Sequence, residues 1–380
     1  MKPQNTKGRK KSEILILLLS ALPFIDYVSG AAVFLAVAGA IVFDKSAIKT
    51  AASDRKSFAL CAIISAFSML SAIVAGNLIG AAVSVGIFCF LMILLYLKAN
   101  MTAELFRRAE TVISLGSAVA MLAALFQKYV IFPDGELYRP TAGAFNANYF
   151  GAIAVMVSLV ALVHLFDDEK SGRSDTSKLW WMGVLAVNTV SLFISESRSS
   201  LLSFTACVIA LLLLKKRYVY CGIAVAGGVA MWLTGWLSPS FFSWSNSLLY
   251  GFTERTVIWA NAFRSFSQSP YTALIGRGPM SYYFVMEREG LFAANHAHNL
   301  LLDSLINVGI IGTALYALLA ARIYGIVYRK RREGDGNGFM LSVLLTVQIL
   351  TQGIADVTIV WHQCAVLAAL IMTSRFKTKA

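Results

Sequence analysis

The sequence has few charged residues for its length. Only 14% of its 380 residues are Asp, Glu, Lys or Arg, whereas 58% are hydrophobic, and soluble domains average about 25% charged residues. A soluble globular protein is therefore excluded, and the chain is predicted to be a polytopic membrane protein of the all-α class. No cleavable signal peptide is expected, because the basic opening MKPQNTKGRKK leads into ILILLLSALPF without a small-residue cleavage site. The first apolar segment is expected to stay as an anchor.

Residue patterns that commonly carry chemistry are scarce. The five cysteines all lie inside apolar runs, with no CxxC pair and no spacing that suits a metal site, so we interpret them as packing residues. On the predicted outer face there is no carboxylate pair and no cluster of metal ligands, and no glycine-rich nucleotide loop faces the cytoplasm. The sequence thus predicts no cofactor and no metal. The net charge of +13 falls in short clusters between apolar runs, which argues against nucleic acid as a partner and for topology signals.

Apolar runs long enough to cross a bilayer recur along the chain. A hydrocarbon core of about 30 Å needs roughly 17 to 25 helical residues, and dividing the chain on this basis predicts twelve helices in one membrane domain, residues 1–380. A long segment rich in aromatic residues, 238–297, joins the ninth run to the tenth. The runs lie near residues 13–27, 28–43, 57–75, 78–97, 110–131, 148–166, 179–195, 199–214, 218–237, 299–325, 338–354 and 357–374.

The distribution of basic residues supports this division. With the N-terminus inside, the predicted cytoplasmic segments hold 26 of the 33 Lys and Arg residues, as expected because short cytoplasmic loops carry such residues. Both termini are then cytoplasmic, and the segment 238–297 is extracytoplasmic. The seven basic residues left on the extracytoplasmic side are Lys128, Arg139, Arg198, Arg255, Arg264, Arg277 and Arg288.

A short charged hairpin, SESRSS at residues 195–200, interrupts two apolar runs. It is too short to leave the membrane surface, so Arg198 lies at the edge of the hydrocarbon, where an ionisable side chain is costly unless it has a partner or a function. Arg198 either extends to the surface and pairs with Glu196 or binds a ligand. Arg139, in the segment YRPTAGAFNANYFG, is a second guanidinium on this side. Asn146 and Asn148, beside Gly151 in the same segment, are interpreted as a loop and helix start.

Residues 254–268 are predicted to form an amphipathic helix that Ser269-Pro270 ends. We expect its apolar arc to face the membrane. Arg255 falls on the same arc, one turn before Trp259. This position indicates either a ligand-binding role, which we favour, or a cation–π contact with Trp259. The arc consists of Ile258, Trp259, Ala262 and Phe266.

Only four histidines occur, and two of them, His296 and His298, lie together before the tenth run. Imidazole is the side chain best matched to proton transfer near neutral pH. A polar stripe then runs along the tenth helix at a spacing of four residues, and polar residues at that depth face protein or a cavity rather than lipid. For Asp303 a packing role and a functional role stay open. The stripe consists of Asn299, Asp303 and Asn307.

The extracytoplasmic side thus combines several arginines with a histidine. Guanidinium forks suit phosphate oxygens. An enzyme on this face has no access to nucleotide donors, so its phosphorylated substrate is expected to be a lipid pyrophosphate that has been flipped across the membrane.

Together these segments resemble the bacterial O-antigen ligase and O-antigen polymerase family of integral membrane glycan transferases. The likeness rests on the SRSS hairpin, on ERTVIWANAF followed by PYTALIGRGPMSYYF, and on HAHNLLLDSLINVGIIG; GAFNANYFG also matches, with Ala147 where a proline is common. The resemblance implies a GT-C-like fold, an undecaprenyl-pyrophosphate-linked glycan donor and a glycan or lipid-linked glycan acceptor. It also implies metal-independent transfer at the outer face of the bacterial cytoplasmic membrane, with a polysaccharide chain-length regulator as a further partner.

The resemblance assigns roles to individual residues. Arg198 and Arg255 match the family's two motif arginines, which hold the pyrophosphate, and His298 matches its essential histidine, the expected general base. Arg139 and Arg277 are added as pyrophosphate-binding candidates. The expected supporting residues are Glu196, His296, Asn299, Asp303 and Trp259.

Polymerase and ligase stay open at this point. We slightly prefer a polymerase of surface polysaccharide or O-antigen, because nothing marks a site for a lipid A core acceptor of lipopolysaccharide. A flippase or exporter is the alternative of a different class, and it is disfavoured because the two halves of the chain differ. A non-catalytic scaffold would tolerate substitution of His298 and Arg198.

Overall fold

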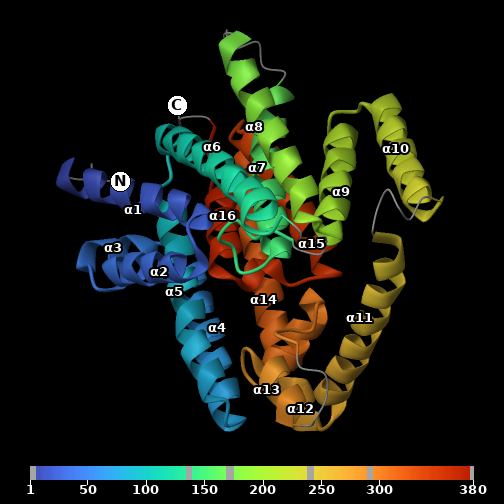
Figure 1. Cartoon of the computed structure of the whole chain (residues 1–380). Coiled ribbons are helices and arrows are strands. Elements are labelled where there is room, and N and C mark those ends of the chain that lie inside the picture. Colours follow the sequence, from blue (N-terminus) through green and yellow to red (C-terminus); the bar gives the residue numbers. More distant parts are fainter. Residues whose placement is uncertain (1–5, 134–138, 168–174, 238–243, 289–293, 377–380) are drawn as a thin grey trace.

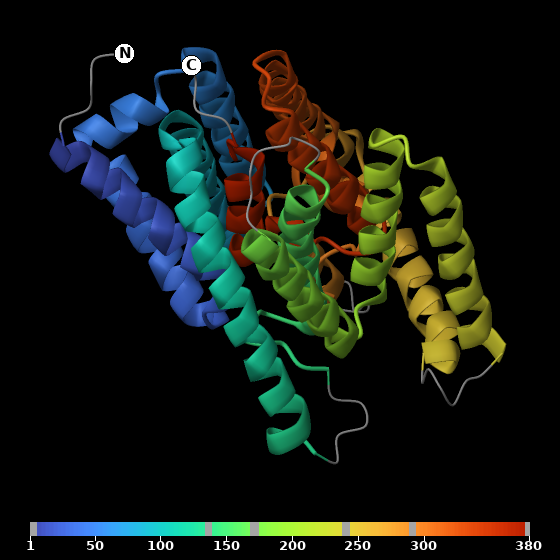
Figure 2. The same ribbon diagram turned by 90° about the horizontal axis from the view of Figure 1, so that it is seen from above.

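The computed structural model describes residues 6–133, 139–167, 175–237, 244–288 and 294–376. Every regular element within these ranges is a helix, which confirms the all-α class. The helices pack as a bundle (Figure 1, Figure 2). The elements are α1 (Thr6–Ala21), η1 (Leu22–Phe24), α2 (Tyr27–Val42), α3 (Lys45–Ala51), α4 (Arg55–Val74), α5 (Leu78–Asn100), α6 (Ala103–Phe126), η2 (Gln127–Ile131), α7 (Ala147–Leu165), α8 (Asp175–Ser195), α9 (Arg198–Leu214), α10 (Tyr218–Leu237), α11 (Trp244–Ser267), α12 (Pro270–Ile275), α13 (Ser281–Arg288), α14 (Leu300–Arg332), α15 (Gly336–Gly353), η3 (Thr358–Val360) and α16 (His362–Met372).

A helix overlaps each of the twelve predicted apolar runs. In the described ranges, six helical segments are long and apolar enough to cross a membrane, and α2 with α3, bent by 92°, would make a seventh. The helices α9 and α16 and the first half of α10 are apolar but shorter. A polytopic membrane protein is therefore supported, whereas twelve spans and a GT-C-like arrangement stay predictions. The six segments are α4, α5, α6 with η2, α7, α8 and α14.

The central helix α7 is buried along almost its whole length, because its sequence is apolar on every face. It packs against α8, α9, α15 and α16, and its 19 residues span about 28 Å. At its C-terminal end, Nε2 of His164 lies 2.7 Å from Oε1 of Glu110, and the ring stacks on Trp181 near Phe376. The N-terminus of α7 therefore lies at the other end of the bundle, the predicted extracytoplasmic end.

Helix α14 is broken at Gly309, where φ is +64°. The turn after α12 packs against this break so closely that a Cβ on Gly276 would lie 2.6 Å from backbone atoms of Asn307. The N–H of Arg277 donates to the freed carbonyl of Ile306 (2.9 Å). Unwound backbone at membrane depth is tolerated when other parts of the protein supply its hydrogen bonds. The turn that carries Arg277 supplies one here, so the break fixes the position of this turn against α14.

The predicted amphipathic helix over residues 254–268 forms the second part of α11, which ends at Ser267. The expectation that its apolar arc faces the membrane is wrong, because Ile258 and Ala262 are buried inside the protein. A periodic stripe shows that one face is buried, but lipid and protein produce the same stripe. The other members of this apolar cluster are Tyr282, Ala294, Ala297 and Ile306, with Trp259, Phe266 and Leu302 packed against it.

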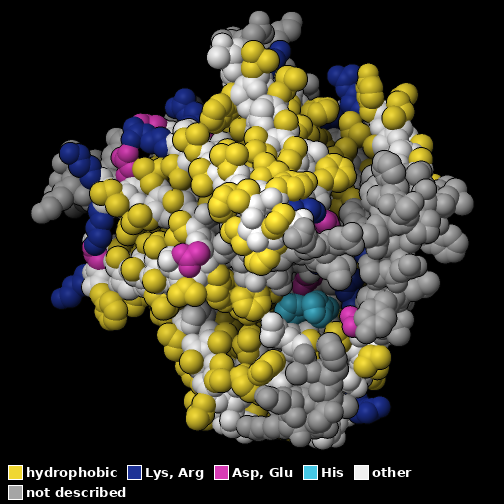
Figure 3. Space-filling model, viewed as in Figure 1, with side chains coloured by type: hydrophobic (Ala, Val, Ile, Leu, Met, Phe, Trp, Pro, Cys, Tyr) yellow, Lys and Arg dark blue, Asp and Glu magenta, His cyan; other side chains and the backbone are white. Residues whose placement is uncertain are grey.

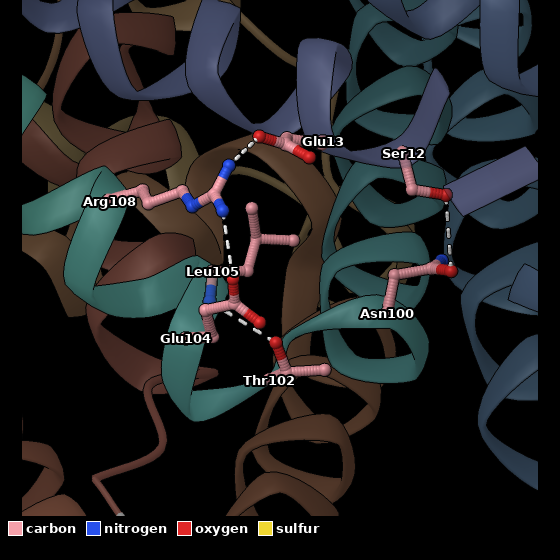
Figure 4. A pocket seen from close by; sticks show the side chains of 7 residues that line it. All are labelled: Ser12, Glu13, Asn100, Thr102, Glu104, Leu105 and Arg108. Carbon is pink, nitrogen blue, oxygen red and sulfur yellow. Dashed lines mark hydrogen bonds and ion pairs between the residues drawn. The ribbon is translucent and has the colours of Figure 1, made fainter. Parts of the chain in front are cut away.

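A small pocket lies between α1, α5 and α6 (Figure 4). On one side the Arg108 guanidinium donates to the carboxylates of Glu13 on α1 and Glu104 on α6. On the other side Ser12 Oγ donates to Asn100 Oδ1 (3.4 Å). Because these groups satisfy one another, we interpret them as contacts that join α1 to the neighbouring helices.

Candidate functional site

His296 and His298 lie in a tight turn before α14. His298 has a positive φ of 49°, and its backbone N–H donates to Nδ1 of His296 (3.1 Å). Nδ1 of His296 must therefore be unprotonated, which places the proton of the neutral ring on Nε2. The N–H of Ala297 donates to the Asp303 carboxylate (3.0 Å), and Asn299 caps α14. These bonds hold the turn, and with it both imidazoles, in one conformation.

A carboxylate that the sequence analysis did not single out lies beside the two imidazoles. Asp356, between α15 and α16, is 1% exposed, and its Oδ1 lies 3.4 Å from Nε2 of His296 and 3.4 Å from Nδ1 of His298. The segment QGIADVTIV joins the last two predicted apolar runs, and the sequence analysis named no candidate residue in it. Its one acidic residue was nevertheless a signal, because an ionisable group at the edge of hydrocarbon is costly without a function.

Three of the predicted arginines gather at the same end of the bundle. Arg139 donates through Nε to the carbonyl of Ser195 (3.1 Å) and through Nη2 to Oδ1 of Asn148 (2.7 Å). Arg198 is the first residue of α9, and the positive charges of Arg139 and Arg255 act on it. Arg255 comes from α11, and its charge also acts on Arg139. Like charges brought together are unfavourable without an anion between them, so the three guanidiniums form a candidate anion site.

The histidine turn is open on one side. Figure 3 shows histidine side chains on the visible face of the molecule, next to basic and acidic side chains. The side chain of His298 is 27% exposed, although its Nδ1 is buried. The exposed part of the ring is therefore the edge that faces away from Asp356, where a substrate could approach.

The serine-rich hairpin that carries Arg198 packs tightly against α7. A Cβ on Gly151 would come within 2.8 Å of atoms of Ser195, Ser197 and Ser200. Only glycine leaves room for this approach. The hairpin is therefore placed by the buried central helix rather than by the membrane surface.

Two predicted site residues make other contacts. Oε1 of Glu196 accepts from Nζ of Lys128 (2.7 Å), so the ion pair of Glu196 is formed with this lysine. Arg277 lies on the turn between α12 and α13, where its guanidinium donates to Gln268 and its carbonyl accepts from Asn77, the residue that caps α5 (3.2 Å). The described contacts of Arg277 thus lie away from the arginine group, and its predicted role in binding pyrophosphate stays a prediction.

Among the described residues, the charges around Arg139 are more positive than negative. Burial lowers the pKa of Arg139, the carboxylates of Glu196 and Asp356 oppose this, and Arg255 adds to it. One of these carboxylates, Glu196, is already paired with Lys128. Within the described ranges, Arg139, Arg198 and Arg255 carry more positive charge than the remaining carboxylate of Asp356 carries negative charge, which suits an anionic ligand.

Burial separates the roles of the two histidines. It lowers the pKa of His296 to about 4, so this ring is neutral near pH 7, in agreement with the proton assigned to Nε2. Burial by itself raises the pKa of Asp356, but the interaction with His298 and the nearby imidazole charges outweigh it and hold this pKa below its usual value. An ionised carboxylate therefore lies behind the exposed imidazole of His298.

Acid is expected to destabilise the fold through His296. Its pKa is about 4 when folded against the usual 6.5, so between these values the unfolded chain binds a proton that the folded chain does not, and stability is lost as the pH falls. At most about 3 kcal/mol is involved, since one pKa unit corresponds to about 1.4 kcal/mol. Thermal unfolding at pH 7 and pH 4.5 should show a lower Tm in acid, and His296→Gln should reduce the difference. An equal difference in this variant would contradict the assignment.

The same three groups also bear on metal binding. One potential ligand atom from each of His296, His298 and Asp356 lies within 4.8 Å of the others. The expectation of no such cluster is corrected, because Asp356 is remote from the histidines in the chain and only the fold brings it to them. The hydroxyl of Tyr149 also lies 3.3 Å from Nε2 of His296, so this nitrogen has polar neighbours without an ion. Metal-independence stays a prediction, tested below.

The fold and this site together define a helical membrane protein with a candidate anion site beside a buried histidine–carboxylate group. Residues 181–317 match a family model described as O-antigen ligase. The match confirms the resemblance to the O-antigen ligase and polymerase family and supports a glycan-handling membrane enzyme. No curated protein matches the chain significantly. The matched region contains Arg198, Arg255 and His298, whereas Arg139 and Asp356 lie outside it and join the site only through the fold.

Proposed function

We propose that the protein is a glycosyltransferase that uses undecaprenyl-pyrophosphate-linked glycan units at the extracytoplasmic face of the bacterial cytoplasmic membrane. The main support is one observation: the arginine group of Arg139, Arg198 and Arg255 lies at the same end of the bundle as an exposed imidazole backed by a buried carboxylate. The first can neutralise a pyrophosphate leaving group, and the second can accept a proton from an acceptor hydroxyl.

The arginines act on the leaving group. As the bond between the anomeric carbon and the pyrophosphate oxygen breaks, negative charge develops on that oxygen. Guanidiniums already in place stabilise this charge, an effect that can reach several kcal/mol in a site poor in water. Arg139 is held for this task by the Ser195 carbonyl and by Asn148.

His298 acts as the general base. The acceptor hydroxyl attacks the anomeric carbon from the face opposite the pyrophosphate, and its proton passes to the exposed nitrogen of His298. Asp356 then stabilises the imidazolium from the Nδ1 side, where the two atoms lie 3.4 Å apart. This long contact is typical of a site without substrate and is expected to shorten when the ring becomes charged.

Polymerase is our first proposal and ligase the alternative within the family. In a polymerase both substrates are lipid-linked, whereas a ligase passes the glycan to lipid A core or another final acceptor. No residue of the site marks a lipid A core acceptor, which favours the polymerase slightly. A flippase or exporter is the alternative of a different class, and a buried carboxylate beside an imidazole could serve it as a proton relay, so the transfer assay has to separate the two classes.

A transfer assay tests the proposal. Purified protein with an undecaprenyl-pyrophosphate-linked repeat unit, and without nucleotide, is expected to produce a ladder of lengthening lipid-linked products on a gel. A single addition seen only with a separate acceptor would establish the ligase instead, and no transfer in either condition would contradict both.

A chelator is expected to leave the transfer rate within about twofold of its value without chelator, because catalysis rests on proton transfer and fixed positive charge. Loss of the transfer rate, restored by a divalent ion, would overturn the metal-free mechanism.

A further inference from the structure

Asn148 connects the two parts of the site. We propose that this asparagine is a positioning residue that couples the arginine holding the donor to the carboxylate behind the base. The proposal deepens the proposed function and rests on it. The sequence predicts a loop and helix start at Asn146 and Asn148, and in the structure the side chain of Asn146 caps α7, whereas that of Asn148 makes other contacts.

The Asn148 amide makes two short hydrogen bonds in opposite directions. Nη2 of Arg139 donates to its Oδ1 (2.7 Å), and its Nδ2 donates to Oδ2 of Asp356 (2.7 Å). A guanidinium has no acceptor and an ionised carboxylate has no donor, so only this orientation of the amide satisfies both neighbours. A residue with only donors or only acceptors could not bridge them.

The backbone of Asn148 is held as firmly as its side chain. Its N–H donates to Oδ1 of Asn146 (2.9 Å), and its carbonyl accepts from Oγ of Ser200 in the hairpin (3.4 Å). It lies in the first turn of α7, the buried centre of the bundle. The amide therefore positions its partners from a rigid element, which is the more accurate way to hold a reacting group.

Each bond has a separate consequence. The bond to Arg139, with that from Arg139 to the Ser195 carbonyl, sets the plane of the guanidinium and leaves its remaining N–H groups to the donor. The bond to Asp356 occupies Oδ2. Oδ1, which also accepts the N–H of Val357 (2.8 Å), is then the oxygen that faces the histidines. Loss of one amide should therefore affect donor binding and the chemical step together.

Double-mutant cycles test this coupling. Asn148→Ala alone is expected to weaken binding of undecaprenyl pyrophosphate about fivefold and to lower kcat about tenfold. When Asn148→Ala is added to an Arg139→Ala protein, binding should weaken further by less than about twofold. When Asn148→Ala is added to an Asp356→Asn protein, kcat should fall further by less than about twofold. Full additivity in both cycles would overturn the proposal.

A buried asparagine elsewhere provides the matched control. Asn188 in α8 donates to Ser117 Oγ (3.0 Å) and to the Val184 carbonyl (2.8 Å), so Asn188→Ala should lower Tm without changing kcat or donor affinity. The same result for Asn148→Ala would show a merely structural role. Failure of the proposed function and failure of this inference can be told apart, because binding of undecaprenyl pyrophosphate is measured without transfer. Wild-type protein that neither binds undecaprenyl pyrophosphate nor transfers glycan would overturn both. Active wild-type protein with additive cycles would overturn only the inference about Asn148.

Discussion

Replacement of His298 by alanine is expected to reduce glycan transfer by about 10²- to 10⁴-fold, the range that a positioned general base contributes. The reason is geometric: His298 is the partly exposed imidazole of the turn, and its Nδ1 side is buried against an ionised Asp356. Without the ring, the acceptor hydroxyl has no base in reach. The affinity for undecaprenyl pyrophosphate should stay within about twofold, because the arginines are untouched. The measurement is kcat in the transfer assay, with donor binding measured separately.

A histidine outside the turn makes the comparison specific. His362 packs against Tyr27 and Phe34 and has no part in the mechanism, so His362→Gln should keep transfer within about threefold. Full transfer by the His298→Ala protein would remove the assignment of the base. Loss of donor binding along with loss of the rate would instead make His298 a binding residue.

Neutral replacement of Arg198 or Arg255 is expected to reduce transfer by about 10²- to 10³-fold, the effect of removing one preorganised group that stabilises developing charge. Arg198→Gln and Arg255→Gln each lose a full positive charge next to the leaving oxygen. Lysine at either position should cost less, about tenfold, because it restores the charge but not the two-pronged hydrogen bond to phosphate oxygens. The rate and the affinity for undecaprenyl pyrophosphate are both expected to fall, and both are measured at fixed ionic strength because salt screens such contacts.

The same helix supplies the control for Arg255. Arg264 also lies on α11 but is exposed, and Arg264→Gln should leave transfer unchanged. Arg277→Gln should reduce the transfer rate less than tenfold, since Arg277 contacts Gln268 and Asn77 rather than the arginine group in the described part of the chain. Normal donor affinity and normal rate in Arg198→Gln would contradict the pyrophosphate role, and an equal loss in Arg264→Gln would indicate a general charge effect.

The sequence by itself determined the helical membrane class and pointed to most residues of the candidate site. Apolar runs of span length leave few other folds, because backbone in hydrocarbon must satisfy its own hydrogen bonds. Arg139, Arg198 and Arg255 lie on the predicted extracytoplasmic side, where basic residues are uncommon, so each can be recognised from the sequence as a candidate. The pair of histidines before α14 can be recognised in the same way. These features are local in the chain, so a pattern of neighbouring residues was sufficient to find them.

Only the tertiary structure decided how these groups meet. Asp356 reaches the histidines, and Asn148 reaches both Arg139 and Asp356, across large separations in the chain, and no local pattern encodes such a contact. The same limit explains the one wrong expectation about α11: lipid and protein present the same apolar surface to a helix, so periodicity alone could not show that Ile258 packs against protein rather than lipid. Burial and hydrogen-bond partners are properties of the packed bundle, and they distinguish the buried His296 from the partly exposed His298, which the sequence presents as a pair.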